Sequence, residues 1–214
     1  MILLDGKALS EKIKEEVKVE VAQLVEEKQI TPGLAVILVG NDAASATYVA
    51  SKAKSCKNAG IYSVVHEMPE SITQAELLET IARMNENPKL DGILVQLPLP
   101  KHIDTTVVLE AIDPLKDVDG FHPYNVGRLV SNLDTFLPAT PFGVMRMFEE
   151  YGIDLVGKNV CVIGSSDIVG KPMASLLSNA KATVTICNSR TKDLAFFTKA
   201  ADIVVIAVGV PHLL

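Results

Sequence analysis

The chain has 214 residues, of which 48% are hydrophobic and 21% are charged, and this composition is typical of a globular protein with one large domain or two small ones. It excludes disorder, collagen-like repeats and disulfide scaffolds as the main state of the chain. A formal net charge of -6 gives no general attraction to nucleic acid or anionic membranes, and we find no local basic patch that would supply one.

Cysteine usage and the N-terminal sequence bear on the compartment. The cysteines form neither a C-x-x-C pair nor a disulfide framework, which favours a reducing environment. The first residues lack the features of a signal peptide, and no apolar run approaches the ~18 residues that span a bilayer. We therefore expect a cytoplasmic protein with no membrane or nucleic-acid partner. The histidines fall in separate segments, so we expect no metal site; they are His66, His102, His122 and His212.

The first half of the chain alternates predicted helices and strands. Apolar residues at helical spacing predict an amphipathic helix over residues 9–28. Short apolar runs of the kind buried in parallel sheets follow, and each is succeeded by a helical stretch. Strict alternation implies right-handed crossovers and a parallel sheet. The strands are predicted over 34–39, 63–67 and 92–96, and the helices over 44–59, 73–85 and 104–112.

A second domain is predicted after a stretch rich in proline and glycine. Residues 113–141 are expected to lack regular elements and to connect two domains, which we assign to residues 1–138 and 139–214. A helix over 142–151 and strands over 159–163, 182–187 and 202–208 then predict a Rossmann-like mononucleotide-binding half. A complete domain of this kind needs further strands, so we expect its C-terminal end to be missing. The fold class is α/β, a parallel-sheet substrate domain followed by a Rossmann-like dinucleotide-binding domain.

The loop that follows the strand at 159–163 is a candidate phosphate site. Small residues there let backbone N–H groups approach a pyrophosphate at a helix N-terminus. The spacing is not G-x-G-x-x-G, and a bare strand-to-helix turn is the alternative. The cofactor-binding candidates in this loop are Gly164, Ser165, Ser166, Ile168, Val169 and Gly170.

The end of the next predicted strand bears on which cofactor binds. NAD sites have an acidic residue near this point, whereas this chain has Ser189 and Arg190, a hydroxyl and a cation suited to a 2′-phosphate. This favours NADP. The alternative is that Arg190 is a solvated loop charge and that Asp193 binds the ribose.

One face of the predicted helix at 44–59 carries a candidate catalytic group. Ser45, Tyr48 and Lys52 stand at i, i+3 and i+7 and project together. A lysine among apolar and aromatic neighbours can lose its proton near neutral pH and act as a general base. The alternative is an exposed lysine beside a half-buried tyrosine, and spacing alone favours that alternative.

Two further segments supply candidate ligand contacts. Gln96 ends a predicted strand at the carboxyl edge of the sheet, where open α/β folds bind ligands, and Pro98 stiffens the turn after it. Asp117 and Asp119 stand in a tight turn, where a carboxylate can accept two N–H groups from an amino-heterocycle. A purely structural Asp-Gly turn is the alternative.

Five motifs in a fixed order resemble one family. Tyr48-x-x-x-Lys52, Val95-Gln-Leu-Pro-Leu-Pro100, Lys116-Asp-Val-Asp-Gly-Phe121, Pro138-Ala-Thr-Pro141 and Ile168-Val-Gly-Lys-Pro172 closely resemble the bacterial methylenetetrahydrofolate dehydrogenase/methenyltetrahydrofolate cyclohydrolases. The resemblance spans the chain. It implies NADP-dependent oxidation of 5,10-methylenetetrahydrofolate and hydrolysis of the methenyl product to 10-formyltetrahydrofolate, in one-carbon metabolism, by a homodimer.

The same resemblance implies residue roles. Lys52 would catalyse the cyclohydrolase step, Gln96 would hold Lys52 by a hydrogen bond, and Tyr48 would stack on the folate. Asp119 would bind the pterin amino edge, and Ser45 and Pro98 would line the substrate site. Some members carry an arginine where this chain has Ser165, which leaves Arg190 as the main 2′-phosphate candidate. The family chain also continues beyond the position of Leu214.

Two other functions compete with this interpretation. Short-chain dehydrogenases also use a Tyr-x-x-x-Lys pair, but there the pair follows the nucleotide fold, whereas Tyr48 and Lys52 precede Gly164. The second alternative is a non-catalytic fragment that binds folate or a partner chain because its cofactor domain is unfinished.

Overall fold

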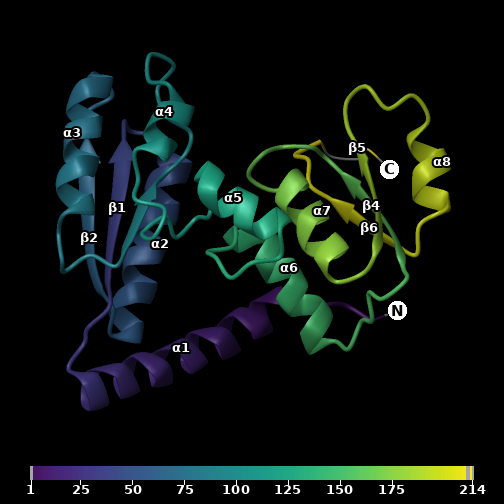
Figure 1. Cartoon of the computed structure of the whole chain (residues 1–214), viewed down its shortest axis with the longest axis horizontal. Helices are drawn as coiled ribbons and strands as arrows, with labels where there is room; N and C mark the ends of the chain where they lie inside the picture. The colour runs from purple at the N-terminus through teal and green to yellow at the C-terminus, as the bar shows by residue number, and fades with distance from the viewer. Residues whose placement is uncertain (1, 211–212, 214) are drawn as a thin grey trace. The chain divides into compact units, whose positions relative to one another are not determined.

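A computed structural model describes residues 2–210 and 213, so that His212 lies outside the described residues. Packing divides the chain into two compact units, one of Asp5–Val118 and one of Asp119–Leu214 with the short N-terminal segment before Asp5 (Figure 1). The boundary that the sequence analysis assigns, between residues 138 and 139, stays a prediction.

The first unit is built on a parallel three-stranded sheet. The strand order is β2-β1-β3, and Ile37 of β1 pairs with His66 of β2 and Val95 of β3. Helices connect the strands, as the predicted alternation requires. The elements are α1 (Gly6–Lys28), β1 (Gly33–Val39), α2 (Ala43–Ala59), β2 (Tyr62–Met68), α3 (Gln74–Asn85), β3 (Gly92–Val95) and α4 (Thr105–Glu110).

Side-chain caps fix where the helices of this unit begin. Asp42 precedes α2 and its carboxylate accepts a hydrogen bond from the Ser45 N–H at 2.7 Å. Thr73 precedes α3 and forms a capping box with Glu76, as the sequence pattern Thr-x-x-Glu predicts. Because the α2 cap follows β1 after a short turn, α2 starts at the carboxyl edge of the sheet.

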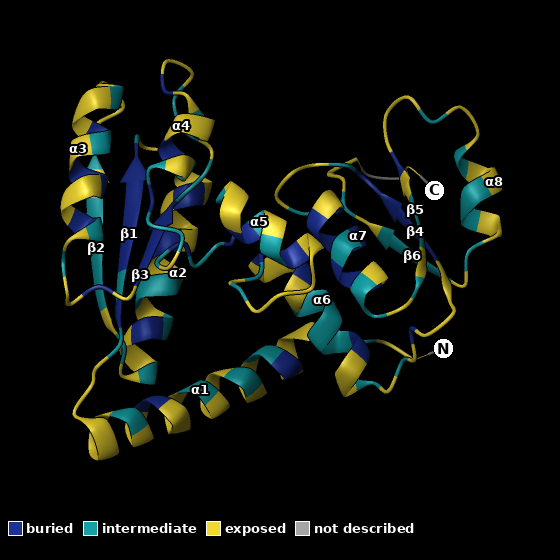
Figure 2. Cartoon of the chain, viewed as in Figure 1, coloured by how far each residue is buried: buried dark blue, intermediate teal, exposed yellow. Residues whose placement is uncertain are grey.

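The central strand β1 is buried on both faces because helices cover both sides of the sheet (Figure 2). Ala35, Ile37 and Val39 pack with residues of α3 and α4. The intervening Val36 and Leu38 pack with Val49 of α2. This two-residue period explains why β1 reads as a continuous apolar run in the sequence.

The second unit repeats the architecture. Its parallel sheet has the order β5-β4-β6, and Ile163 of β4 pairs with Cys187 of β5 and Ile206 of β6. Its cores contain Val162 and Leu177 on one side, and Cys161 and Cys187 with α8 on the other. The elements are α5 (Pro123–Val130), α6 (Ala139–Glu150), β4 (Asn159–Ile163), α7 (Gly170–Asn179), β5 (Thr183–Cys187), α8 (Leu194–Lys199) and β6 (Ile203–Ile206).

The prediction that residues 113–141 lack regular elements is wrong, because α5 lies inside this stretch and α6 begins within it. Pro123 occupies the first turn of α5, where its missing N–H is no loss. The ring nitrogen Nδ1 of His122 accepts a hydrogen bond from the Tyr124 N–H at 3.0 Å and caps the helix. Proline and glycine thus mark the start and the interior of a short helix here, rather than a loop.

Candidate active site

The candidate catalytic lysine lies at the carboxyl edge of the first sheet. Lys52 is half-buried on α2, and its Nζ donates a hydrogen bond to Oε1 of Gln96 at 3.1 Å. Gln96 is itself fixed, since its backbone N–H donates to the carbonyl of Ile37 at 2.9 Å and its Nε2 donates to the carbonyl of Leu97 at 2.9 Å. The Gln96 amide oxygen therefore faces Lys52, and the two side chains predicted to act together lie in contact.

The other residues of this helix face differ in exposure. Ser45 is buried and lies next to the cap of α2, while 65% of Tyr48 is exposed, which leaves its ring free to contact a planar ligand. The hydrogen bond from the Ser45 N–H holds the pKa of Asp42 below its ordinary value, so the cap is a carboxylate at neutral pH. This face of α2 is therefore held by a capping hydrogen bond at its start and is exposed to solvent at Tyr48.

Pro98 lines a shallow cleft of the first unit. The cleft has a volume of about 360 Å³ and lies where β1 and β3 end, with Asp42, Glu70 and Leu99 also in its lining. The peptide bond between Leu97 and Pro98 is cis. Ligand clefts of open α/β folds occur at this edge of the sheet, which is consistent with a substrate site here.

Lys116 makes tertiary hydrogen bonds that the sequence analysis does not predict. Its Nζ donates hydrogen bonds to the carbonyls of Asn85 at 2.7 Å and Asn87 at 3.0 Å, and its own carbonyl accepts from the Ile93 N–H at 2.7 Å. These bonds hold the segment that contains the buried Asp117 against β3. No local signal in the sequence indicates these contacts, because the two carbonyls lie 31 and 29 residues earlier.

Asp119 opens the second unit and is partly buried. Within the first unit, the contact between Lys52 and Gln96 is the one described above. The role of Asp119 at the pterin stays a prediction.

The loop between β4 and α7 is a backbone cradle with no room for side chains at its two glycines. Gly164 has a φ of +119°, and a Cβ built on it would lie 2.5 Å from the carbonyl oxygen of Ala207. A Cβ on Gly170 would lie 2.1 Å from the carbonyl oxygen of Gly164. Both contacts are with backbone atoms, so no side-chain movement relieves them. Only glycine fits at either end of the loop.

The remaining loop residues stand around the start of α7. The Ser166 hydroxyl accepts hydrogen bonds from the N–H groups of Val169 and Gly170, both at 3.3 Å. Ser165 is partly buried, and Ile168 is exposed with 42% of its surface at solvent. The positive end of the α7 dipole faces this loop, which favours an anionic group there.

Ser189 and Arg190 stand at the same edge of the second sheet. The Gly164 N–H donates to the carbonyl of Cys187 at 2.8 Å, so the end of β5 lies beside the glycine loop. The Arg190 N–H donates to Oδ1 of Asn188 at 2.9 Å, which fixes the turn, and the Arg190 side chain is exposed. The glycine cradle, the α7 N-terminus and a nearby guanidinium fit the pyrophosphate and 2′-phosphate of a dinucleotide.

Two negative findings apply to the described part of the chain. Among these residues, no group of three or more His, Cys, Asp or Glu side chains is arranged to hold a metal ion. Over the same residues, no helix is both long enough and apolar enough to cross a bilayer.

Both halves of the chain match sequence models of known domains. Residues 4–119 match the tetrahydrofolate dehydrogenase/cyclohydrolase catalytic domain. Residues 138–214 match the NAD(P)-binding domain of the same family.

Individual relatives agree with these matches. A "Bifunctional protein FolD" of Aliarcobacter butzleri is 87% identical over all of this chain, which spans 75% of that relative. The crystal structure of the bifunctional FolD enzyme from Campylobacter jejuni has a TM-score of 0.97 at 54% identity, covering 100% of this chain and 76% of that one. A Trypanosoma brucei dehydrogenase-cyclohydrolase, solved with NADP and an inhibitor, has a TM-score of 0.94 at 40% identity, covering 98% and 72%.

Proposed function

The chain belongs to the tetrahydrofolate dehydrogenase/cyclohydrolase family, and from this premise we propose that it oxidises 5,10-methylenetetrahydrofolate with NADP⁺ and hydrolyses the methenyl product to 10-formyltetrahydrofolate. The observation that carries the proposal is the hydrogen bond between Lys52 and Gln96 at the carboxyl edge of the first sheet. A short-chain dehydrogenase is disfavoured because Tyr48 and Lys52 belong to a unit other than the one that holds the glycine loop.

The cyclohydrolase step requires a proton acceptor near the carbon that water attacks. The methenyl substrate is a cation, which an ammonium group beside it would repel. Lys52 would serve as the general base that accepts a proton from the attacking water, and Gln96 directs its Nζ by accepting a hydrogen bond from it. Tyr48 offers an exposed ring on which the folate stacks, and Ser45 and Pro98 border the same edge.

For the oxidation, the second unit has the residues that a dinucleotide needs. The loop from Gly164 to Gly170 would hold the pyrophosphate, and Ser189 and Arg190 would hold the 2′-phosphate. Bound NADP⁺ supplies the hydride acceptor. The residues of the chain bind and orient the two reactants, which is the main requirement of hydride transfer.

The proposal also covers the cellular compartment and the oligomeric state of the protein. We infer a cytoplasmic location, supported by three cysteines that are all free thiols. We also infer a homodimer, as the family resemblance implies. Large apolar side chains are exposed around α5, among them Val130 and Leu133, and such a surface is suited to contact with a second copy of the chain. Light scattering after size-exclusion chromatography measures the mass of the protein in solution and so distinguishes a dimer from a monomer.

The decisive experiment replaces Lys52 by methionine, which keeps the length of the side chain and removes the amine. Hydrolysis, followed as loss of methenyltetrahydrofolate absorbance, is expected to fall about 10²- to 10⁴-fold, the usual contribution of a general base. Folate binding is expected to remain. The control is Lys57→Met, an exposed lysine on the same helix, which should hydrolyse normally. A Lys52→Met protein with normal hydrolysis contradicts the proposal.

A further inference from the structure

The glycine loop of the second unit contains an acidic residue, although a phosphate site favours positive charge. Within residues 164–170, Asp167 is the one charged residue, and its side chain is 85% exposed. The pyrophosphate of a dinucleotide is anionic at neutral pH, so the Asp167 carboxylate repels the group that this loop would hold. An uncompensated Asp167 would therefore oppose cofactor binding.

Lys171 compensates this carboxylate in the structure. Its Nζ lies 2.5 Å from Oδ1 of Asp167. The backbone of Lys171 is tied to the loop, because its N–H donates a hydrogen bond to the carbonyl of Ser166 at 3.0 Å. The cation is therefore held at the point where α7 leaves the loop.

The stability of α7 does not explain a lysine at this position. Lys171 is the second residue of the helix, and the first turn contains no acidic residue. A cation at a helix N-terminus is unfavourable beside the positive end of the helix dipole, and an ion pair between exposed side chains stabilises a protein little. A bound anion changes this balance, because it interacts favourably with both the helix end and the lysine.

We propose that Lys171 enables the glycine loop to bind a dinucleotide by compensating the charge of Asp167, so that the net charge of this pair sets the affinity for the pyrophosphate. The inference rests on the proposed function, which places the pyrophosphate at this loop. The role differs from that proposed for Arg190, because NADP and NAD share the pyrophosphate but not the 2′-phosphate. Lys171 therefore raises the affinity for both cofactors alike.

Calorimetric titration of the wild type, Asp167→Asn, Lys171→Gln and the double variant with NADP⁺ and NAD⁺ tests this proposal. Lys171→Gln leaves the pair negative, and it should lose about three- to fivefold affinity for both cofactors, as expected for one exposed charge contact. Asp167→Asn leaves the pair positive and should gain affinity by up to about the same factor. The double variant is neutral, like the wild type, and should bind within about twofold of it.

Two further variants separate the effect of charge from that of structure. Lys171→Arg keeps the charge and should bind like the wild type. Lys158→Gln makes the same charge change at an exposed lysine directly before β4, whereas the loop follows the other end of that strand, about 16 Å away. Because charges are screened over about 10 Å at 0.1 M salt, Lys158→Gln should leave both affinities unchanged.

Four results would overturn the proposal. They are a Lys171→Gln protein that binds both cofactors as tightly as the wild type, a double variant as weak as Lys171→Gln, a loss confined to NADP, and differences that persist unchanged at about 1 M salt. Failure of the proposed function has a different signature, because the wild type then binds neither cofactor. In that case inorganic pyrophosphate, titrated alone into the same proteins, decides the matter. Affinity that follows the charge of the pair supports the proposal, and absence of binding overturns it.

Discussion

Gly170 decides whether the backbone cradle of the second unit can form. A methyl group at this position would lie 2.1 Å from the carbonyl oxygen and 2.6 Å from the carbonyl carbon of Gly164, so Gly170→Ala must move the loop. We expect a loss of about 1 to 3 kcal/mol in the free energy of unfolding, as for other overpacked sites, together with weaker NADP binding. Urea denaturation and an NADP titration measure the two effects.

The matched control for this substitution is Gly143→Ala. Gly143 lies inside α6, and a Cβ there would have no atom within 4 Å. Alanine should therefore stabilise the helix by about 0.5 to 1 kcal/mol, because it restricts the unfolded chain more than glycine does. Opposite signs for the two substitutions are the expected result, and a neutral Gly170→Ala would mean that the loop does not need its close approach.

Arg190 is the residue that we expect to make the protein bind NADP more tightly than NAD. Its side chain is exposed at the end of β5, where a 2′-phosphate would meet it, and a charged hydrogen bond contributes about 1.5 to 3 kcal/mol. Arg190→Ala should weaken NADP binding about tenfold or more and leave NAD binding nearly unchanged. The ratio of the two dissociation constants is the quantity to measure. Equal losses for both cofactors would assign Arg190 a role other than phosphate recognition.

At the scale of a helix, the start of α3 should make stability depend on pH. The hydroxyl and N–H of Thr73 both donate to Glu76, and these hydrogen bonds lower the pKa of Glu76 from its ordinary value of 4.5. A lowered pKa in the folded state means that the carboxylate stabilises the protein above pH 4.5 and that this contribution is lost as the pH falls through the folded-state pKa.

Glu76→Gln tests this dependence, since glutamine keeps the capping geometry and removes the charge. The wild type should be more stable than the variant at pH 7, and the two should converge below pH 4.5. Thr73→Ala should cost about 1 kcal/mol, as loss of an N-cap hydroxyl usually does, and should reduce the pH dependence. Melting curves from pH 3.5 to 7 would refute the argument if the difference between wild type and Glu76→Gln stayed constant.

Several helices and strands, and the Lys52–Gln96 contact of the candidate site, were predictable because they follow from patterns within short stretches of sequence and from the order of strands and helices. The α3 capping box and the apolar run of β1 lie within a few residues of sequence. Lys52 and Gln96 were predictable as neighbours because one stands on a helix that follows a strand and the other ends a strand of the same sheet. The family resemblance added the pairing itself.

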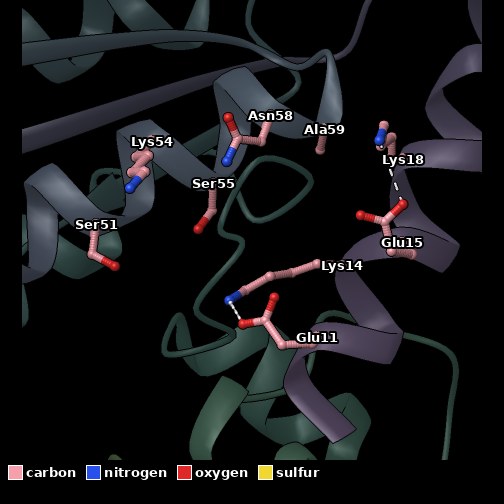
Figure 3. A pocket seen from close by; sticks show the side chains of 9 residues that line it. All are labelled: Glu11, Lys14, Glu15, Lys18, Ser51, Lys54, Ser55, Asn58 and Ala59. Atoms are coloured by element: carbon pink, nitrogen blue, oxygen red, sulfur yellow. Dashed lines mark hydrogen bonds and ion pairs between the residues drawn. The ribbon is translucent and has the colours of Figure 1, made fainter. Parts of the chain in front are cut away.

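Features that depend on tertiary contacts could not be predicted from the sequence. Lys116 donates hydrogen bonds to the carbonyls of Asn87 and Asn85, which lie 29 and 31 residues earlier, and no local sequence pattern predicts such contacts. A polar groove lined by residues within 11–18 of α1 and 51–59 of α2 is not predictable either, because its two sides come from helices that are separate in the sequence (Figure 3). The sequence pattern does not predict α5, because Pro123 and Gly127 are residue types typical of breaks, although proline is compatible with a first helical turn.

For the whole molecule, two separate cores imply two units that respond separately to ligands. Residues of β1, β3 and α3 form one core, and residues of β4, α6 and α7 form another. A ligand stabilises the structure that it binds, by about 2.7 kcal/mol at 100 times its dissociation constant. If the folate contacts lie in the first unit and the NADP contacts in the second, each ligand acts mainly on one core.

Hydrogen exchange followed by mass spectrometry should resolve this response. NADP at 100 times its dissociation constant should slow exchange in β4, β5 and α7 by about 100-fold wherever exchange requires opening of that unit, and tetrahydrofolate should do the same for β1 and β3. The same experiment assigns residues 119–138 to one of the two units. Protection of these residues by NADP would place them in the second unit, as the packing divides the chain, whereas protection by folate would support the boundary expected after residue 138. Equal protection of both sheets by either ligand alone would mean that the units open as one, and the two-core argument would fail.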